Sequence, residues 1–393
     1  MSEVVEKCNN QSLNHFLSDS VWQWQPILDA LSKRCFKLFL SLKDPVALLI
    51  DESSFPKKGK HSVGVSHQYC GQSGKQDNCQ VGVFGALCSG NSVSIIQSKL
   101  YLPKEWINDK TRGKKAGIPQ NEKYKSKIEL AEEIILHVWK KLKLKFSFVS
   151  FDAFYGRDLS LLNSLSQAGI IFMADIPENY SIYLEPFDIK VPKKKEGRGR
   201  MPIHAKPCAS KISVSQYEKG LKRKDFKKIT IRKGTKESIK SFFHKRTVWL
   251  FNDESKTRSC YILLIRKDED GTTRYSLTNS KKQLPKLAFM QGQRYFVERA
   301  FQDAKQQLGL NEYQVRSYSA WQRHITMSIM ASQFLTEEKI RQKKVQTYFT
   351  SADIVKLLVA ILPENKLSLE ELILKIKKKN KPYEGLVKSI KPG

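Results

Sequence analysis

The sequence predicts a mixed α/β fold in which a sheet is flanked by helices and interrupted by a β-rich insertion. Apolar β-type runs at 46–50, 80–88 and 92–102 indicate three strands that pair as a meander. Helical and strand patterns then alternate through residues 125–176, as expected when helices cover a sheet. Residues 177–284 break this rhythm with short β-like runs between turn and charge signals, which indicates an insertion.

The order of these elements divides the chain into five segments. Residues 1–44 space their large apolar side chains as a short helical region does, and residues 45–176 form the first part of the core. The β-rich insertion at 177–284 follows. Residues 285–335 complete the core with amphipathic helices, and residues 336–393 form a basic helical tail.

A predicted helix at 291–309 has charged residues along the border of its buried stripe. Arg294, Glu298 and Lys305 place one acid between two bases on nearly the same side of the helix. An ion-pair ladder explains this pattern as well as a functional site does. The helix therefore indicates a site only if other acids meet Glu298.

Two further acids follow buried strands. Asp51 stands where the apolar run 46–50 ends, and Asp152 directly follows the run 146–151. A carboxylate in such a place is costly unless it is paired or bound to a metal. Because Mg²⁺ prefers hard oxygen ligands, we expect Asp51, Asp152 and Glu298 to bind divalent cations.

The charge balance indicates a polyanionic partner. The 393 residues carry 69 Lys and Arg against 39 Asp and Glu, a net charge of +30, and residues 190–246 alone hold 20 basic against 4 acidic side chains. Such a run is often only solvated, but its place between strand patterns favours contact with a phosphate backbone. The residues expected to make this contact are Lys193, Lys194, Lys195, Arg198 and Arg200.

Several other classes of protein are disfavoured. The seven cysteines include no CxxC pair, which is typical of reduced thiols, and His61, His67, Cys70 and Cys79 match no usual zinc spacing. The glycine-rich loop at 59–66 lacks the lysine that a P-loop requires. No run of 18 apolar residues and no signal peptide is present, so we expect a cytoplasmic protein without a membrane partner.

The helix at 291–309 resembles that of the DDE transposases of bacterial insertion sequences, of the IS-four type with a Tyr-x2-Arg-x3-Glu-x6-Lys signature. Arg294, Glu298 and Lys305 stand at the signature spacings, whereas Gln291 occupies the tyrosine position and Tyr295 lies nearby. The segments 48–65, 69–83 and 309–327 are also similar to this family, in the same order. The resemblance covers roughly residues 13–334.

The resemblance implies a DNA transposase with a ribonuclease-H-like catalytic core. Asp51, Asp152 and Glu298 would bind two Mg²⁺ ions, with Mn²⁺ as a substitute, while Arg294 and Lys305 would hold phosphates. Trp249 is the candidate for holding a flipped base, because some family members use a tryptophan of the inserted domain. DNA ends and target DNA are the implied partners, with a homodimer on paired ends in the nucleoid of a bacterial cell.

Two alternatives stay open at this point. One is a related nuclease that cleaves DNA without joining strands. The other is a non-catalytic basic DNA-binding protein, such as a shortened or decayed copy, because only 50 residues precede Asp51 whereas the family generally carries a longer helical region there.

Overall fold

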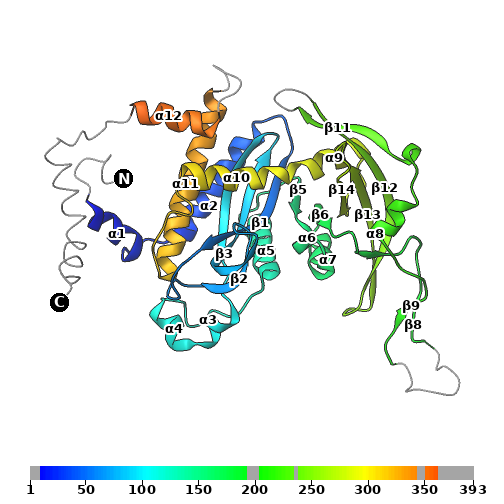
Figure 1. Cartoon of the computed structure of the whole chain (residues 1–393), viewed down its shortest axis with the longest axis horizontal. Helices are drawn as coiled ribbons and strands as arrows, with labels where there is room; N and C mark the ends of the chain where they lie inside the picture. Colours follow the sequence, from blue (N-terminus) through cyan, green and yellow to red (C-terminus); the bar gives the residue numbers. More distant parts are fainter. Residues whose placement is uncertain (1–8, 193–202, 234–237, 343–349, 362–393) are drawn as a thin grey trace, which may run out of the picture.

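One large mixed sheet runs through the molecule, which is described by a computed structural model at residues 9–192, 203–233, 238–342 and 350–361 (Figure 1). Ten strands form this sheet, in the order β11-β12-β13-β14-β6-β5-β1-β3-β2, with β4 also paired to β3. The strands are β1 (Val46–Pro56), β2 (Ser66–Cys70), β3 (Lys75–Ser89), β4 (Ser92–Leu100), β5 (Phe148–Phe151), β6 (Phe172–Ile176), β11 (Lys227–Lys233), β12 (Ser238–Asn252), β13 (Thr257–Lys267) and β14 (Thr273–Thr278).

Most neighbouring strands of this sheet are antiparallel. The parallel pairs are β1 with β5 and β5 with β6. The mixed α/β class predicted from the sequence, with a large mixed sheet flanked by helices, is therefore confirmed. The arrangement is compatible with a ribonuclease-H-like fold.

Helices cover both faces of the sheet because successive strand residues point to opposite sides. In β1, Leu48 and Ile50 belong to a core that includes buried residues of α5 (Lys127–Leu136) and α7 (Leu159–Gln167). Ala47 and Leu49 belong to a second core on the other face. That second core is closed by α9 (Leu284–Gln293), α10 (Tyr295–Gln307) and α11 (Tyr318–Gln342).

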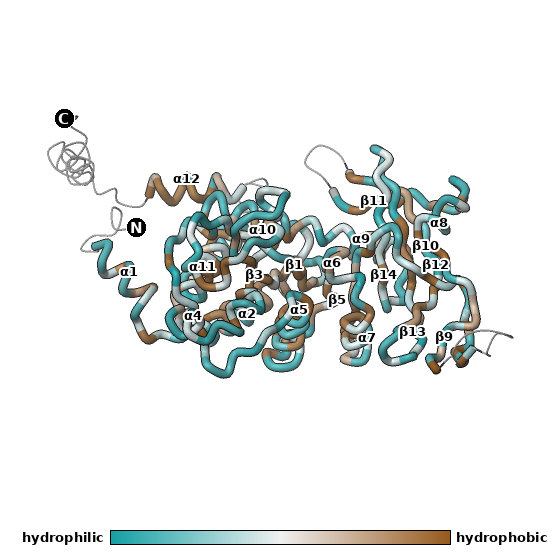
Figure 2. The backbone as a smooth tube through the Cα atoms, turned by 60° about the horizontal axis from the view of Figure 1, so that its bottom comes forward, coloured by the Kyte–Doolittle hydropathy of each residue, from teal (hydrophilic) through white to brown (hydrophobic). Residues whose placement is uncertain are grey.

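Helices from both ends of the chain pack beside α11. The first two are α1 (Asn10–Ser18) and α2 (Trp24–Leu40), and α12 (Ser351–Ile361) contacts α10 and α11. Figure 2 shows α12 as a strongly hydrophobic helix at the outside of the fold. Within the residues that the structure describes, none of the helices has the length and apolar character needed to cross a membrane.

Short elements connect these layers. A π-helical turn follows α5 and carries the chain toward β5. The connecting elements are α3 (Lys104–Asn108), α4 (Lys110–Lys115), the π-helical turn (His137–Lys141), α6 (Ala153–Gly156), β7 (Ser181–Ile182), β8 (Ile189–Lys190), β9 (Lys206–Pro207), β10 (Ile212–Ser213), α8 (Val214–Lys219) and a 3-10 turn (Arg223–Asp225).

Strand β1 is longer than the sequence predicts. It continues to Pro56, so the expectation that the strand ends at Asp51 is wrong. The polar residues after Asp51 stay in the strand because β3 pairs with them, from Phe84 opposite Asp51 to Cys79 opposite Pro56. Phe55 is also buried in the second core. Asp51 therefore projects from the middle of an ordered strand, not from a loop.

Three smaller expectations also fail, one of them in part. The Gly- and Lys-rich composition of residues 54–78 predicts a connection between strands, but β2 lies within it and pairs with β3. The β-like run 211–216 forms only the two-residue strand β10, and from Val214 it is the start of α8, because Ser213 caps that helix in a capping box with Gln216. The helical spacing of Trp321, Ile325, Ile329 and Phe334 predicts that all four are buried on one face of α11, but Phe334 is 46% exposed and Leu335 is buried there.

The strands expected between 177 and 284 are present as β11 to β14, but they do not form a separate sheet. Strand β14 pairs with β6, with Ser276 opposite Asp175, so these strands extend the sheet of the core. Strand β6 in turn pairs with β5, the strand that leads to Asp152. A separate insertion domain with the bounds 177–284 stays a prediction.

Gly156 provides a test of the packing between α6 and β6. A Cβ atom at this position would overlap the carbonyl oxygen of Asp175. We expect Gly156→Ala to lower the free energy of unfolding by about 1–3 kcal/mol, as overpacking does in other cores. Urea denaturation measures this change. Gly59→Ala is the control, because a Cβ there has nothing within 4 Å; equal denaturation midpoints for the two variants would contradict the packing argument.

Candidate active site

Two of the predicted acids occupy matching positions on neighbouring parallel strands. Leu49 on β1 lies opposite Ser150 on β5. Two residues after this pair come Asp51 and Asp152. The same register therefore places their carboxyl groups side by side. Asp152 also caps α6, accepting hydrogen bonds from the backbone N–H of Phe154 at 3.0 Å and of Tyr155 at 3.4 Å.

A third acid continues this row on the next strand. Phe151 on β5 lies opposite Ala174 on β6, so the following residues, Asp152 and Asp175, are also in register. Because residues alternate between faces, Asp51, Asp152 and Asp175 all project toward the face covered by α9 and α10. The sheet therefore presents a row of three carboxyl groups to these two helices.

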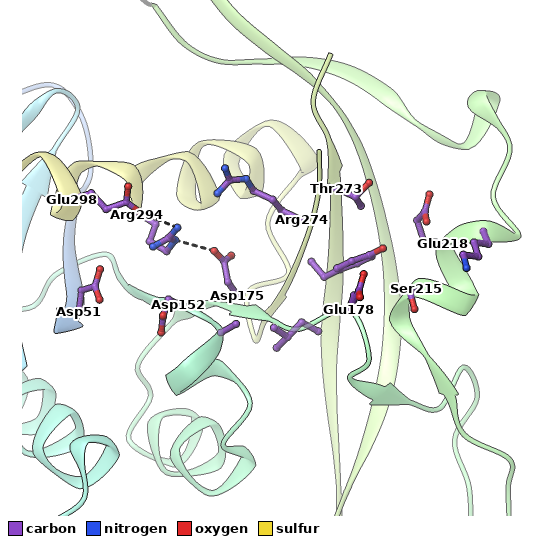
Figure 3. Close-up of a pocket in the computed structure, with 14 residues that line it drawn as sticks. Asp51, Asp152, Asp175, Glu178, Ser215, Glu218, Thr273, Arg274, Arg294 and Glu298 are labelled. Carbon is purple, nitrogen blue, oxygen red and sulfur yellow. Dashed lines mark ion pairs between the residues drawn. The ribbon is translucent and has the colours of Figure 1, made fainter. Parts of the chain in front are cut away.

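The junction of α9 and α10 supplies a cation and a fourth acid to this row. The Nε atom of Arg294 lies 2.9 Å from Asp175 Oδ2, and its Nη2 atom lies 3.2 Å from Glu298 Oε1. Figure 3 shows Arg294 between these two carboxylates, with Asp51 and Asp152 below it. The predicted Arg294 and Glu298 are thus brought to the two predicted aspartates.

These groups line one cavity of about 900 Å³. Its further lining comes from β6, α8 and β14, so the strands that extend the core sheet form one of its walls. The charged residues around it are Asp51, Asp152, Asp175, Glu178, Glu218, Lys219, Arg274, Arg294 and Glu298.

Burial and repulsion by neighbouring carboxylates raise the pKa values of Asp51 and Asp152. Burial, and then the charge of Asp152, raise the pKa of Asp51 to about 7. Burial, and then the charge of Glu52, raise the pKa of Asp152. Neither has a Lys, Arg or His within ion-pair distance among the residues described, although the charge of Arg294 lowers both pKa values. Two adjacent carboxylates therefore lack a close compensating cation.

This deficit of positive charge is what a divalent cation bound by oxygen ligands would correct. Asp51 and Asp152 fit such an ion. Glu298 lines the same cavity, but its carboxylate is held by Arg294. In the described ranges of the chain, no three His, Cys, Asp or Glu side chains converge closely enough to hold a metal ion as they stand. The triad of Asp51, Asp152 and Glu298 stays a prediction.

A second polar cluster lies behind the aspartates, on the face of α5. Glu52 follows Asp51 on β1 and therefore points to the opposite face. It accepts a hydrogen bond from the Tyr155 hydroxyl at 2.7 Å and pairs with Lys127 at 3.0 Å. Burial and the charge of Glu52 raise the pKa of Tyr155 well above its usual value, so this phenol stays protonated.

The remaining predicted residues lie elsewhere. The Nζ atom of Lys305 is 3.5 Å from the carbonyl oxygen of Ser54, and the side chain does not line the cavity. Trp249 lies on β12, bridged through its backbone to Tyr183, and does not line the cavity either. The basic residues expected to contact a phosphate backbone fall outside the described residues; they are Lys193, Lys194, Lys195, Arg198 and Arg200.

Sequence reasoning missed Asp175 and Ser276. Asp175 stands in an apolar β-type run, which is the same signal that points to Asp152. Ser276 on β14 donates a hydrogen bond to Asp175 Oδ1 at 2.5 Å. No pattern in the sequence links Ser276 to the site, because the link depends on the pairing of β14 with β6.

The pKa of Asp51 predicts how stability depends on pH. Folding raises this pKa from its ordinary 3.8 to about 7, so the folded state binds the proton more tightly than the unfolded state does. Its charge therefore destabilises the fold progressively as pH rises from about 4 to 7. We expect Asp51→Asn to gain stability at pH 8 in EDTA, by at most about 4 kcal/mol, and little below pH 4. Thermal unfolding at both pH values measures this, and an equal effect at both would contradict it.

Comparison with known proteins adds two findings. A family profile described as DDE superfamily endonuclease matches residues 1–238, which include Asp51 and Asp152 but not Glu298. A protein of Microchaete diplosiphon, described as a probable transposase for insertion sequence element IS701, is 28% identical over 193 residues, covering 47% of this chain and 46% of that protein. The chain thus spans about half the length of this curated relative.

Proposed function

The chain belongs to the DDE superfamily of endonucleases, and from this premise we propose that it is a DNA transposase that cuts and joins DNA at the ends of an insertion sequence. The observation that carries the proposal is the pair of in-register carboxylates, Asp51 and Asp152, facing Glu298 across one cavity. The described relative is a probable transposase of an insertion sequence element, which supports the same reading.

The finer proposal is a ribonuclease-H-like catalytic core with a two-metal site. The antiparallel strands β1, β3 and β4, followed by the parallel strands β5 and β6, support that core. Asp51, Asp152 and Glu298 would hold two Mg²⁺ ions, or Mn²⁺ in their place. Bound there, the ions would activate a water or 3′-hydroxyl oxygen and stabilise charge on the leaving oxygen during in-line attack on phosphorus.

The protein's own residues have two tasks in this mechanism. Asp51 and Asp152 keep their charges side by side on a rigid sheet, where repulsion disfavours a metal-free dianion. Arg294, whose charge acts on both carboxylates, would bind a phosphate next to the scissile bond. No covalent protein nucleophile is needed.

Contacts with DNA beyond the cavity belong to the basic part of the chain. The excess of positive charge between 190 and 246 supports a phosphate-binding surface there, including Lys193, Lys194, Lys195, Arg198 and Arg200. Lys305 as a phosphate ligand and Trp249 as a base-holding residue are retained from the family resemblance. We also propose that two copies of the chain act together on paired DNA ends. This would take place in the nucleoid.

The direct test uses linear DNA that carries the inverted repeats expected on both sides of the reading frame. With Mg²⁺ or Mn²⁺ we expect breaks at the repeat boundaries and joining of the new 3′ ends to a target duplex, and with EDTA neither product. Breaks without joining would identify an endonuclease that lacks strand transfer. The absence of breaks with either ion would reject the proposal.

A further inference from the structure

A chain of hydrogen bonds connects the interior of the protein to Glu298. The Gln291 side chain donates through Nε2 to Ser276 Oγ at 2.6 Å, and Ser276 donates to Asp175 Oδ1 at 2.5 Å. Arg294 then binds Asp175 Oδ2 at 2.9 Å and Glu298 Oε1 at 3.2 Å. These contacts thus join β14, β6 and the junction of α9 with α10.

This series of hydrogen bonds is buried at its inner end, at Ser276 and Gln291, and exposed at its outer end, at Glu298. Ser276 is fully buried, and Gln291 is 5% exposed. The side chains of Asp175 and Arg294 are 17% and 16% exposed, whereas that of Glu298 is 57% exposed. An exposed glutamate on a helix ordinarily samples several rotamers. Contact with an anchored guanidinium restricts those rotamers to the side that faces the cavity.

We propose that Asp175 is a positioning residue: it anchors Arg294 so that this guanidinium orients Glu298 toward the cavity and leaves Asp51 and Asp152 free to bind divalent cations. This inference rests on the proposed function. Asp175 supplies the negative charge that keeps the Arg294 guanidinium at β6. The same guanidinium already acts electrostatically on Asp51 and Asp152.

Loss of the Asp175 charge would redirect Arg294. A mostly buried guanidinium without its closest anion turns to the remaining carboxylates, because an unpaired charge in such a place is costly. The carboxylates within its electrostatic reach are Asp51, Asp152 and Glu298. An arginine paired with them competes with a divalent cation for the same oxygens. Asp175 thus acts on metal binding through Arg294, without touching the ion.

The simpler reading is that Asp175 and Arg294 form an ion pair that only stabilises the fold, and the chain offers a matched control for it. Asp268 also accepts a hydrogen bond from a serine, Ser241, at 2.5 Å. It also pairs with an arginine Nε atom, that of Arg266, at 2.6 Å, and its side chain is 16% exposed. Asp268 does not line the cavity of the aspartates.

The test measures Mn²⁺ binding to the full chain by calorimetry, without DNA. We expect Asp175→Asn to weaken Mn²⁺ binding about 10- to 100-fold, as loss of an outer partner of metal ligands does, and Asp268→Asn to change it less than about 2-fold. Both variants are expected to lower the thermal stability. In an Arg294→Gln background, Asp175→Asn should cause no further loss of affinity. Unchanged Mn²⁺ affinity in Asp175→Asn would overturn the proposal.

A crystal structure of metal-free Asp175→Asn separates this inference from the proposed function. We expect the Arg294 guanidinium to leave β6 and approach Asp51 and Asp152. If Arg294 and Glu298 keep their positions, the positioning role is rejected whatever the chain does to DNA. If the wild-type chain binds Mn²⁺ but breaks no DNA, the transposase proposal fails while the positioning role stands.

Discussion

Asp152→Asn is expected to lower metal-dependent DNA cleavage by at least about 10³-fold, because it removes one of the two adjacent carboxylates while keeping the side chain's shape. Asparagine retains the Oδ1 acceptor that caps α6, where Phe154 donates its backbone N–H at 3.0 Å. The fold and the affinity for DNA should therefore stay close to those of the wild type. Cleavage of labelled DNA with Mg²⁺ or Mn²⁺, and a mobility-shift assay in EDTA, measure the two effects.

Asp158→Asn is a closely matched control for this variant. Asp158 caps the next helix, α7, by accepting the backbone N–H of Leu161 at 2.8 Å. It lies six positions after Asp152 and does not line the cavity. Full cleavage activity in Asp158→Asn together with its loss in Asp152→Asn would assign the effect to the site. Similar activity in both variants would show that Asp152 is not part of the catalytic machinery.

The acids on the strands were within reach of sequence reasoning because burial leaves a strong local signal. A carboxylate next to an uninterrupted apolar run is unusual, and this signal marked Asp51 and Asp152. Their register was not within reach. It depends on which residue of β5 lies opposite which residue of β1, and short parallel strands carry no turn that fixes such a pairing.

The parts that sequence reasoning missed depend on tertiary pairing. The extension of β1 beyond Asp51 follows from its pairing with β3, which keeps a polar segment in the sheet. Asp175 has its partner, Arg294, far away in the sequence, and a single chain gives no sign of that contact. The helical pattern predicts that Arg294 and Glu298 lie on the same side of the helix. It does not predict that the Arg294 guanidinium forms an ion pair with the Glu298 carboxylate at 3.2 Å.

Glu298→Gln is expected to lower cleavage by about 10²- to 10³-fold and to weaken Mn²⁺ binding, because the amide keeps the size of the side chain and removes the charge. Its effect on stability should be small. The ion pair with Arg294 joins residues four apart and its Glu298 partner is 57% exposed, and i,i+4 pairs of this kind contribute about 0.3–0.5 kcal/mol. Cleavage rates, Mn²⁺ calorimetry and thermal unfolding of the same preparation separate these effects.

The same helix provides the control. Asp303 pairs with Arg299 at 3.2 Å, also four residues apart on α10, and it does not line the cavity. Asp303→Asn should therefore cleave DNA at nearly the wild-type rate. If Glu298→Gln cleaves DNA at the wild-type rate, Glu298 is not part of the catalytic site. Asp175, the other acid that Arg294 binds, would then be the carboxylate to test as the third ligand, because it continues the row formed by Asp51 and Asp152.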